Sequence, residues 1–600
     1  MQEELKKRSE VQEQLTWDLS ALYQTREEFQ QAVDQLKQDV EQFSKKYEGN
    51  LSSTSIVLGA LTEFESIMTV FQRTNQYAYL PASTDLTNSD YIELSRYMQN
   101  VSAELATQLS FFDTELMSVD TNTLDEAAQS EPRLAPYIRH IKKNKDIRLD
   151  PAVEKALAQL SPVLSAPESI YDQAKLADMD FGTFTVDGKD YPLSFVLYED
   201  YYAFHPDADI RRAAFDKFSA VLRQYQNVVA TTYYTQIQYE KTMATMRGFD
   251  SVIDYLLYGQ EVDQELYNRQ IDIIMSDLAP VMRKYAAHLK EVHSLDKITY
   301  ADLKIDLDTD YSMPVTIEES KDIVADAVSS LGDDYTDRIM KAYPERWVDF
   351  VQNVGKSTGG FCSTTYDTHP YILMSWTNQL SDVYTLIHEL GHAGQGILTN
   401  ENNSILGSTP SLYLIEAPST FNELLLTDYL QRKSDDPRQE RFALTKMISN
   451  TYFHNFVTHL LEAAYQREVY RLVDAGKGFD AAKLSELKRG VLEQFWGEDV
   501  EINPGAELTW MRQPHYYMGL YPYTYSAGLT IATQAFLKLK EEGQPMVENW
   551  LEFLKLGDQK EPVEAAAVAG VDITTSKPLD DTIHYLDETV DRIIALTEQI

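Results

Sequence analysis

The segment SDVYTLIHELGHAGQ, residues 381–395, contains the pattern on which the predicted fold and chemistry of this chain both depend. Its apolar side chains recur at spacings of three and four residues, which is the period of one helical face. These side chains are Val383, Leu386, Ile387 and Leu390. Ser381 precedes them and is a favourable residue type for an N-cap. The segment is therefore predicted to form a helix with one buried face.

His388 and His392 lie one turn apart on this predicted helix. Imidazoles at positions i and i+4 can each direct a ring nitrogen toward a single metal ion. Glu389 is rotated by about 100° from His388 and can reach a water molecule on that ion, where it would act as a general base. This H-E-x-x-H arrangement predicts a hydrolytic site with one zinc ion.

A third zinc ligand is expected downstream, because catalytic zinc normally has three protein ligands and one open position. Glu416 begins a second segment with helical apolar spacing, and Pro418 suits the first turn of that helix. Glu416 and Glu423 are seven positions apart and share a face, so either could bind the metal. We favour Glu416 as the ligand and Glu423 as the acceptor that orients a histidine.

A short β region, predicted over residues 358–377, precedes the zinc helix. Gly359 and Gly360 would let a peptide backbone approach closely, so that a substrate could be added as a strand to an exposed sheet edge. A simple turn at the two glycines is the alternative, and the sequence supports both interpretations equally.

The segment RQPHYYMGLYPYTYSAG, residues 512–528, contains several hydrogen-bond donors close together. A phenol or imidazole beside the metal would stabilise the oxyanion that forms when water attacks an amide. His515, Tyr521, Tyr523 and Tyr525 are the candidates, and we favour Tyr521 or Tyr525 with His515 at the substrate carbonyl. His454 and His459 fall on an otherwise apolar helix and are interpreted as structural.

The chain has 600 residues, enough for two to four domains, and helical apolar spacing recurs along most of it. In residues 26–48 the stripe is formed by Phe29, Val33, Leu36, Val40 and Phe43. Asp187-Gly188 lies between two β-favouring runs and predicts a hairpin. The fold class is therefore mainly α, with a domain boundary near residue 200.

The net charge of −41, from 53 Lys and Arg against 94 Asp and Glu, opposes nonspecific binding to nucleic acid or to an anionic membrane. No stretch approaches the about 18 consecutive apolar residues of a membrane span. The N-terminus has no apolar signal region, and Cys362 is the one cysteine, which fits a reducing compartment. A cytoplasmic location is expected, and the oligomeric state is left open.

Four segments together resemble oligoendopeptidase F, within the thimet-oligopeptidase-like metallopeptidases. They are HELGHAGQ (388–395), EAPSTFNE (416–423), GGFCSTT with PYILMSWT (359–377), and PHYYMGLYPYTYSAG (514–528). The resemblance implies a two-lobed helical bowl or clam shell around a deep channel, with an N-terminal lobe (1–200) and a catalytic region (201–600). It also implies zinc held by His388, His392 and Glu416, with Glu389 as the base.

The expected activity is internal cleavage of short peptides in the cytoplasm, by a zinc-bound water that Glu389 activates. Two alternatives stay open. A zinc carboxypeptidase on a similar helical scaffold would use the same chemistry in a dead-ended channel. A helical scaffold or peptide-binding protein would have a vestigial H-E-x-x-H motif.

Overall fold

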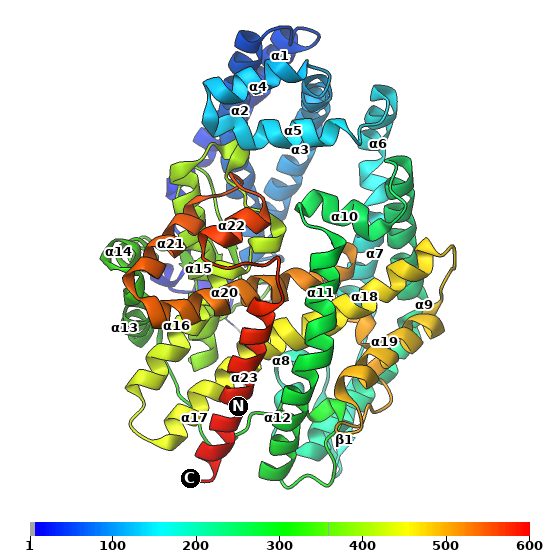
Figure 1. Cartoon of the computed structure of the whole chain (residues 1–600), viewed down its shortest axis with the longest axis vertical. Coiled ribbons are helices and arrows are strands. Elements are labelled where there is room, and N and C mark those ends of the chain that lie inside the picture. Colours follow the sequence, from blue (N-terminus) through cyan, green and yellow to red (C-terminus); the bar gives the residue numbers. More distant parts are fainter. Residues whose placement is uncertain (1–5, 358) are drawn as a thin grey trace.

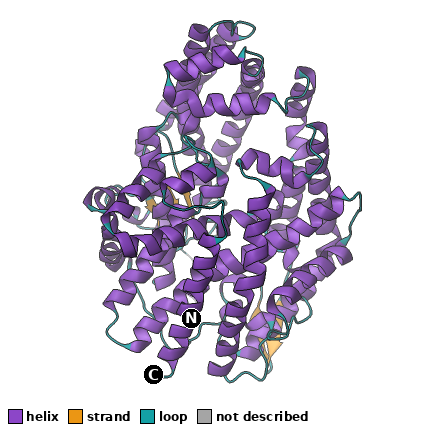
Figure 2. Ribbon diagram, in the orientation of Figure 1, coloured by secondary structure: helices purple, strands orange, loops and turns teal. Residues whose placement is uncertain are grey.

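The computed structural model describes residues 6–357 and 359–600, and helices dominate it (Figure 2). Among these residues the strands form one two-stranded and one three-stranded sheet. The predicted fold class, mainly α with a small β region beside the H-E-x-x-H helix, is confirmed.

Five helices form an N-terminal helical unit, at the top of Figure 1, with a hydrophobic core of its own. They are α1 (Arg26–Tyr47), α2 (Thr54–Thr84), α3 (Ser89–Leu116), α4 (Thr121–Ser130) and α5 (Ala135–Lys145). The stripe predicted for residues 26–48 is the buried face of α1, which packs against α2 and α3. Among the described helices, α2 alone is long and apolar enough to cross a membrane, and 28% of its most apolar window is buried. One such helix is weak evidence of membrane insertion, since core helices share these properties.

The helices from α7 onward share a second, continuous core that runs from Tyr171 to Leu596, and α6 contributes none of its described side chains to it. In Figure 1, α9, α11, α12 and α19 lie on one side of the view and α13, α14, α16 and α17 on the other, while α18 and α20 cross between them. The bounds are α6 (Pro151–Leu164), α7 (Ala166–Gln173), α8 (Phe195–Asp200), α9 (Ala208–Met246), α10 (Val252–Gln260), α11 (Gln264–Ile273), α12 (Ala279–Val292), α13 (Ile317–Val328), α14 (Asp333–Met340), α15 (Leu380–Asn402), α16 (Ala417–Lys433), α17 (Pro437–Lys446), α18 (His459–Asp474), α19 (Ala481–Trp496), α20 (Pro522–Glu542), α21 (Gln544–Lys555), α22 (Pro562–Val568) and α23 (Lys577–Thr597).

Helix α7 precedes residue 200 but packs with the second core. Tyr171 stacks on Tyr517 with ring centroids 4.9 Å apart, and its hydroxyl donates to the carbonyl of Met511. Judged by the cores alone, the division falls between Ile141 and Tyr171. The boundary near residue 200 stays a prediction.

Both predicted β regions form sheets. Strands β1 (Thr183–Val186) and β2 (Lys189–Pro192) make the expected hairpin, with positive φ at Asp187 and Gly188. The second sheet has the order β3-β5-β4, with β3 (Val348–Asp349) parallel and β4 (Phe361–Ser363) antiparallel to the central β5 (Tyr371–Leu373). Strand β4 is thus an edge strand.

Helix α16 is packed directly between α15 and α20, and two glycines make this possible. A Cβ at Gly391 of α15 would lie 2.5 Å from the carbonyl oxygen of Pro418. A Cβ at Gly528 of α20 would lie 2.8 Å from the backbone nitrogen of Ala417. Because no side chain intervenes, the first turn of α16 is held close to both neighbouring helices, and Glu416 with it.

Candidate metal and active site

Helix α15 presents its histidines on the face opposite the core. The apolar stripe at Val383, Leu386, Ile387 and Leu390 is completely buried, while His388 and His392 are partly exposed with ring centroids 5.0 Å apart. The predicted N-cap at Ser381 is wrong. The cap is Gln379, because Asp382 bonds back to its N–H in a capping box and so starts the helix earlier.

Glu416 directly precedes α16, with Pro418 in the first turn as predicted. Its Oε2 lies 3.5 Å from the Nε2 atoms of both His388 and His392, and all three ligand atoms lie within 4.8 Å of one another. Ser419 donates a hydrogen bond to the same oxygen at 3.0 Å. Burial opposes ionisation of Glu416, but the adjacent histidine charges outweigh it and hold its pKa well below the usual range.

Glu423 lies on the other side of His388. Its Oε1 is 2.7 Å from His388 Nδ1, and its Oε2 accepts a hydrogen bond from Thr451. The contact at Nδ1 leaves Nε2 of His388 directed toward Glu416. Burial alone would lower the pKa of His388, but the hydrogen bond with Glu423 and the charges of Glu423, Glu389 and Glu416 raise it to about 10.

Glu389 occupies the space between the histidine face and the sheet. Its carboxylate is buried, and its Oε2 has no hydrogen-bond partner among the described residues. Burial raises the pKa of Glu389 against the lowering effect of the two histidine charges. A buried carboxylate oxygen without a partner is costly and is typical of an atom whose partner arrives with a ligand or a water molecule.

The residues fit a zinc ion. Two imidazoles and one carboxylate form the His₂Glu donor set of catalytic zinc. Three carboxylates lie around the two histidines, at positions 389, 416 and 423, so a dication would offset most of their negative charge. The ligand roles of His388, His392 and Glu416, and the orienting role of Glu423, stay predictions that this arrangement supports.

Three of the four predicted oxyanion donors, His515, Tyr521 and Tyr525, form a cluster beside the same carboxylate. The hydroxyl of Tyr521 is 3.4 Å from Glu416 Oε1, and that of Tyr525 is 3.3 Å from His515 Nε2. Burial lowers the pKa of His515 to about 4, so the imidazole is neutral, and burial raises the pKa of both tyrosines. Tyr523 points elsewhere, because it is fully buried and donates to the side chain of Gln260.

The helical histidines interpreted as structural lie against this cluster. His459 stacks on Tyr525 with ring centroids 4.0 Å apart, and its Nδ1 is 2.8 Å from Glu462. Its Nε2 is 3.1 Å from Nε2 of His454. The His459–Glu462 pair and Ser419 are contacts that the sequence interpretation missed. The available signal was their spacing, since each polar side chain lies three residues from its partner, one helical turn away.

The glycine pair adjoins the base. A Cβ at Gly360 would lie 3.2 Å from Glu389 Oε1 and 3.1 Å from Thr385, so only glycine leaves this space open. Gly359 has φ of +80° and turns the chain into edge strand β4. Cys362 lies in β4, where burial raises the pKa of its thiol. The peptide-binding role of Gly359 and Gly360 stays a prediction.

Comparisons with known proteins relate this chain to a family of peptidases. The sequence profile of peptidase family M3 matches residues 201–585, and that of the oligopeptidase F N-terminal region matches residues 115–181. Oligopeptidase PepF of Bacillus subtilis is 27% identical over 100% of this chain and 89% of its own length. An oligoendopeptidase F homolog of Borreliella burgdorferi is 25% identical over 96% of this chain and 97% of its own length. The crystal structure of oligoendopeptidase-F from Enterococcus faecium superposes with a TM-score of 0.75 at 22% identity, covering 96% of this chain and 99% of that one.

Proposed function

The chain belongs to peptidase family M3, and from this membership we propose that it is a zinc-dependent oligoendopeptidase that hydrolyses internal bonds of short peptides. The observation that supports zinc most directly is the approach of His388, His392 and Glu416 on one side of the buried carboxylate of Glu389. A cytoplasmic location is proposed with it, on the single cysteine of the sequence.

A zinc ion held by His388, His392 and Glu416 would make a water molecule more acidic and polarise the scissile carbonyl. Glu389, with one buried oxygen free, would take the proton from the attacking water and deliver it to the leaving amine. A carboxylate suits both transfers, because the group must accept a proton and release it again.

Tyr521 and Tyr525 would donate hydrogen bonds to the oxyanion that forms at the scissile carbonyl. Strand β4 pairs only with β5 among the described residues, which leaves its outer edge for the backbone of an extended peptide. Recognition through backbone hydrogen bonds at this edge would depend little on substrate side chains.

Cleavage-site mapping with metal analysis tests this function. We expect about one equivalent of zinc, and internal cuts in an N-acetylated, C-amidated peptide that a chelator abolishes and added zinc restores. Release of single C-terminal residues from free peptides would instead identify a carboxypeptidase. Absence of zinc together with absence of chelator-sensitive cleavage would identify a binding scaffold.

A further inference from the structure

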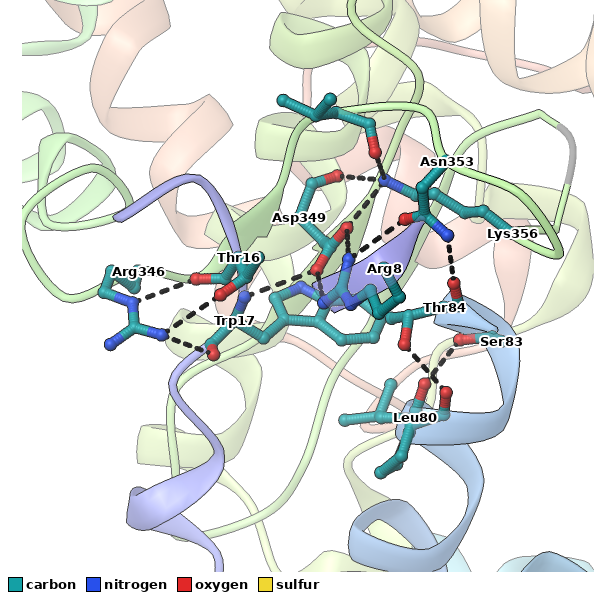
Figure 3. A network of polar contacts seen from close by, with 12 residues as sticks. Arg8, Thr16, Trp17, Leu80, Ser83, Thr84, Arg346, Asp349, Asn353 and Lys356 are labelled. Atoms are coloured by element: carbon teal, nitrogen blue, oxygen red, sulfur yellow. Dashed lines mark hydrogen bonds and ion pairs between the residues drawn. The ribbon is translucent and has the colours of Figure 1, made fainter. Parts of the chain in front are cut away.

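A buried ionic cluster joins the N-terminal segment to the end of strand β3 (Figure 3). Asp349 is completely buried and pairs with two cations, Arg8 and Lys356. Arg8 Nη1 donates to Asp349 Oδ1 at 2.9 Å, and Lys356 Nζ donates to the same oxygen at 2.7 Å.

The cluster contains one more cation than its charge balance requires. A buried carboxylate needs one opposite charge, and burying a second costs free energy unless that group makes further hydrogen bonds. Both cations do make such bonds. Charge balance alone does not explain why two cations are present. We therefore look to the segments of chain that each of the two side chains connects.

Lys356 closes the loop between β3 and β4. Its Nζ also donates to the carbonyl oxygens of Asp349, at 3.0 Å, and Val351, at 2.9 Å. With the Asp349 side chain, these contacts use all three donors of the ammonium group. The side chain is fully buried, so it acts as an internal strut of residues 350–357.

Arg8 connects the N-terminal segment, residues 6–19, to the same loop. Its Nη1 is 3.3 Å from Asn353 Oδ1, and Asn353 Nδ2 in turn donates to the carbonyl of Thr84 at the end of α2. Backbone bonds follow the same route, from Val354 to Lys6 and from Phe350 to Leu15. The loop is thus held between the N-terminal segment and the N-terminal helical unit.

The loop continues into the glycine pair and edge strand β4. Ser357, three residues before Gly360, donates its N–H to the carbonyl of Ser83. A Cβ at Gly360 would lie 3.2 Å from Glu389 Oε1. The anchored part of the loop therefore ends immediately before the backbone that is proposed to bind substrate. None of these bonds joins Arg8 or Lys356 to α15 or α16, the helices that carry the candidate zinc ligands.

We propose that Arg8 and Lys356 are positioning residues, which hold the substrate-binding edge at Gly359–Ser363 in place from the N-terminus and the N-terminal helical unit. The inference rests on the proposed function, because it assigns a task to an edge that would bind peptide. Loosening the loop would weaken the binding of the substrate and of the transition state by the same amount. The proton transfers of Glu389 would be preserved.

Two variants test this, Lys356→Met and Arg8→Met, each of which leaves Asp349 paired with the remaining cation. With a quenched-fluorescent peptide we expect KM to rise about tenfold in each, with kcat within about twofold of wild type. Hydrogen exchange of residues 354–363 should increase in both. Arg247→Met is the matched control, since Arg247 has the same 17% side-chain exposure as Arg8 and pairs with Glu154 of α6 instead of with a residue of the loop. Its KM, kcat and exchange at 354–363 should equal those of wild type.

An unchanged KM in folded Arg8→Met and Lys356→Met would overturn the proposal, as would equal effects in the Arg247→Met control. If Lys356→Met does not fold, Arg8→Met alone decides, because its side chain is partly exposed. If wild type has no peptidase activity, the proposed function fails, and hydrogen exchange still shows whether the two cations hold the loop.

Discussion

Each ring nitrogen of His388 faces a different carboxylate. Glu423 contacts Nδ1 at 2.7 Å, and Glu416 faces Nε2 at 3.5 Å. A carboxylate on one nitrogen fixes the tautomer and orientation of the ring, which prepares the other nitrogen for a metal. The seven-residue separation of the two glutamates produces this division, because it places them two turns apart on one helical face.

Replacing Glu389 by Gln should separate chemistry from metal binding. The substitution leaves His388, His392 and Glu416 unchanged and nearly preserves volume, so we expect about one equivalent of zinc and a kcat lower by several orders of magnitude. Metal analysis and peptide cleavage measure the two effects. Glu401→Gln, at the exposed end of the same helix, should leave both unchanged. Zinc lost together with activity would show that Glu389 binds the metal.

The two tyrosines beside Glu416 should act mainly in the transition state. Tyr521→Phe or Tyr525→Phe is expected to lower kcat by about 10²- to 10³-fold with little change in KM, as for other oxyanion donors. Tyr523→Phe is the control, because Tyr523 donates to Gln260 instead. Steady-state kinetics of the three variants suffices. Normal kcat in both Tyr521→Phe and Tyr525→Phe would exclude these hydroxyls from catalysis.

At the scale of elements, close helix packing sets the distance between the histidines and Glu416. Gly391 and Gly528 let α15 and α20 contact the backbone at the start of α16 without an intervening side chain. The contacted atoms are backbone atoms, which cannot rotate away as a side chain can. The geometry of the candidate metal site therefore depends on two residues that have no functional group.

Gly391→Ala should consequently weaken metal binding. The added methyl group would lie 2.5 Å from the Pro418 carbonyl oxygen and push α16 away from α15, so we expect a lower Tm and zinc affinity reduced by about tenfold or more. Gly490→Ala in α19 is the control, since a Cβ there meets nothing within 4 Å and alanine favours helices. Competition with a chromogenic chelator measures the affinity. Wild-type zinc affinity in Gly391→Ala would mean that α16 can shift without disturbing Glu416.

Helices α9 and α18 are joined by a buried carboxylate whose ionisation should make stability depend on pH. Glu240 accepts hydrogen bonds from Gln236 and from Tyr470, and burial raises its pKa to about 7. Between pH 4.5 and 7 the folded state keeps this proton while the unfolded state loses it, so this contribution to stability falls as pH rises.

Glu240→Gln removes the penalty of ionisation. The Tm difference between the variant and wild type should therefore grow by about 2 °C in favour of the variant from pH 5 to pH 8. Glu548→Gln, at an exposed position of α21, should show no such trend. Calorimetric scans of the variants and of wild type at pH 5 and pH 8 measure these Tm differences. A constant difference would show that Glu240 titrates alike in both states.

At the scale of the whole molecule, periodicity predicted what local patterns determine. The stripe of α1, the buried face of α15 and the Asp187-Gly188 hairpin all follow from residues close in sequence. The pairing of Arg8 with Asp349, 341 positions apart, has no local pattern, because any arginine could neutralise a buried aspartate. The contact of His459 with Tyr525 was missed for the same reason, since it depends on how α18 and α20 cross.

Substrate length should be limited if the helices before residue 200 form a lobe over the zinc site, as the resemblance to oligoendopeptidase F implies. We expect efficient internal cleavage of peptides of about six to twenty residues, since a chain of this size has a radius of gyration of about 25 Å and limited room for flanking residues. Mass spectrometry of a peptide ladder would measure the range. Rapid digestion of casein, under conditions where a short peptide is also cut, would contradict enclosure and leave the zinc chemistry intact.

The attachment of the N-terminal segment also constrains how the protein is made. Arg8 is synthesised well before Asp349 and Lys356. Its ion pair with Asp349 can therefore form only after more than half of the chain has been made. Contacts of such high sequence separation form late and slowly. The edge beside Gly360 is thus completed only after most helices have been synthesised.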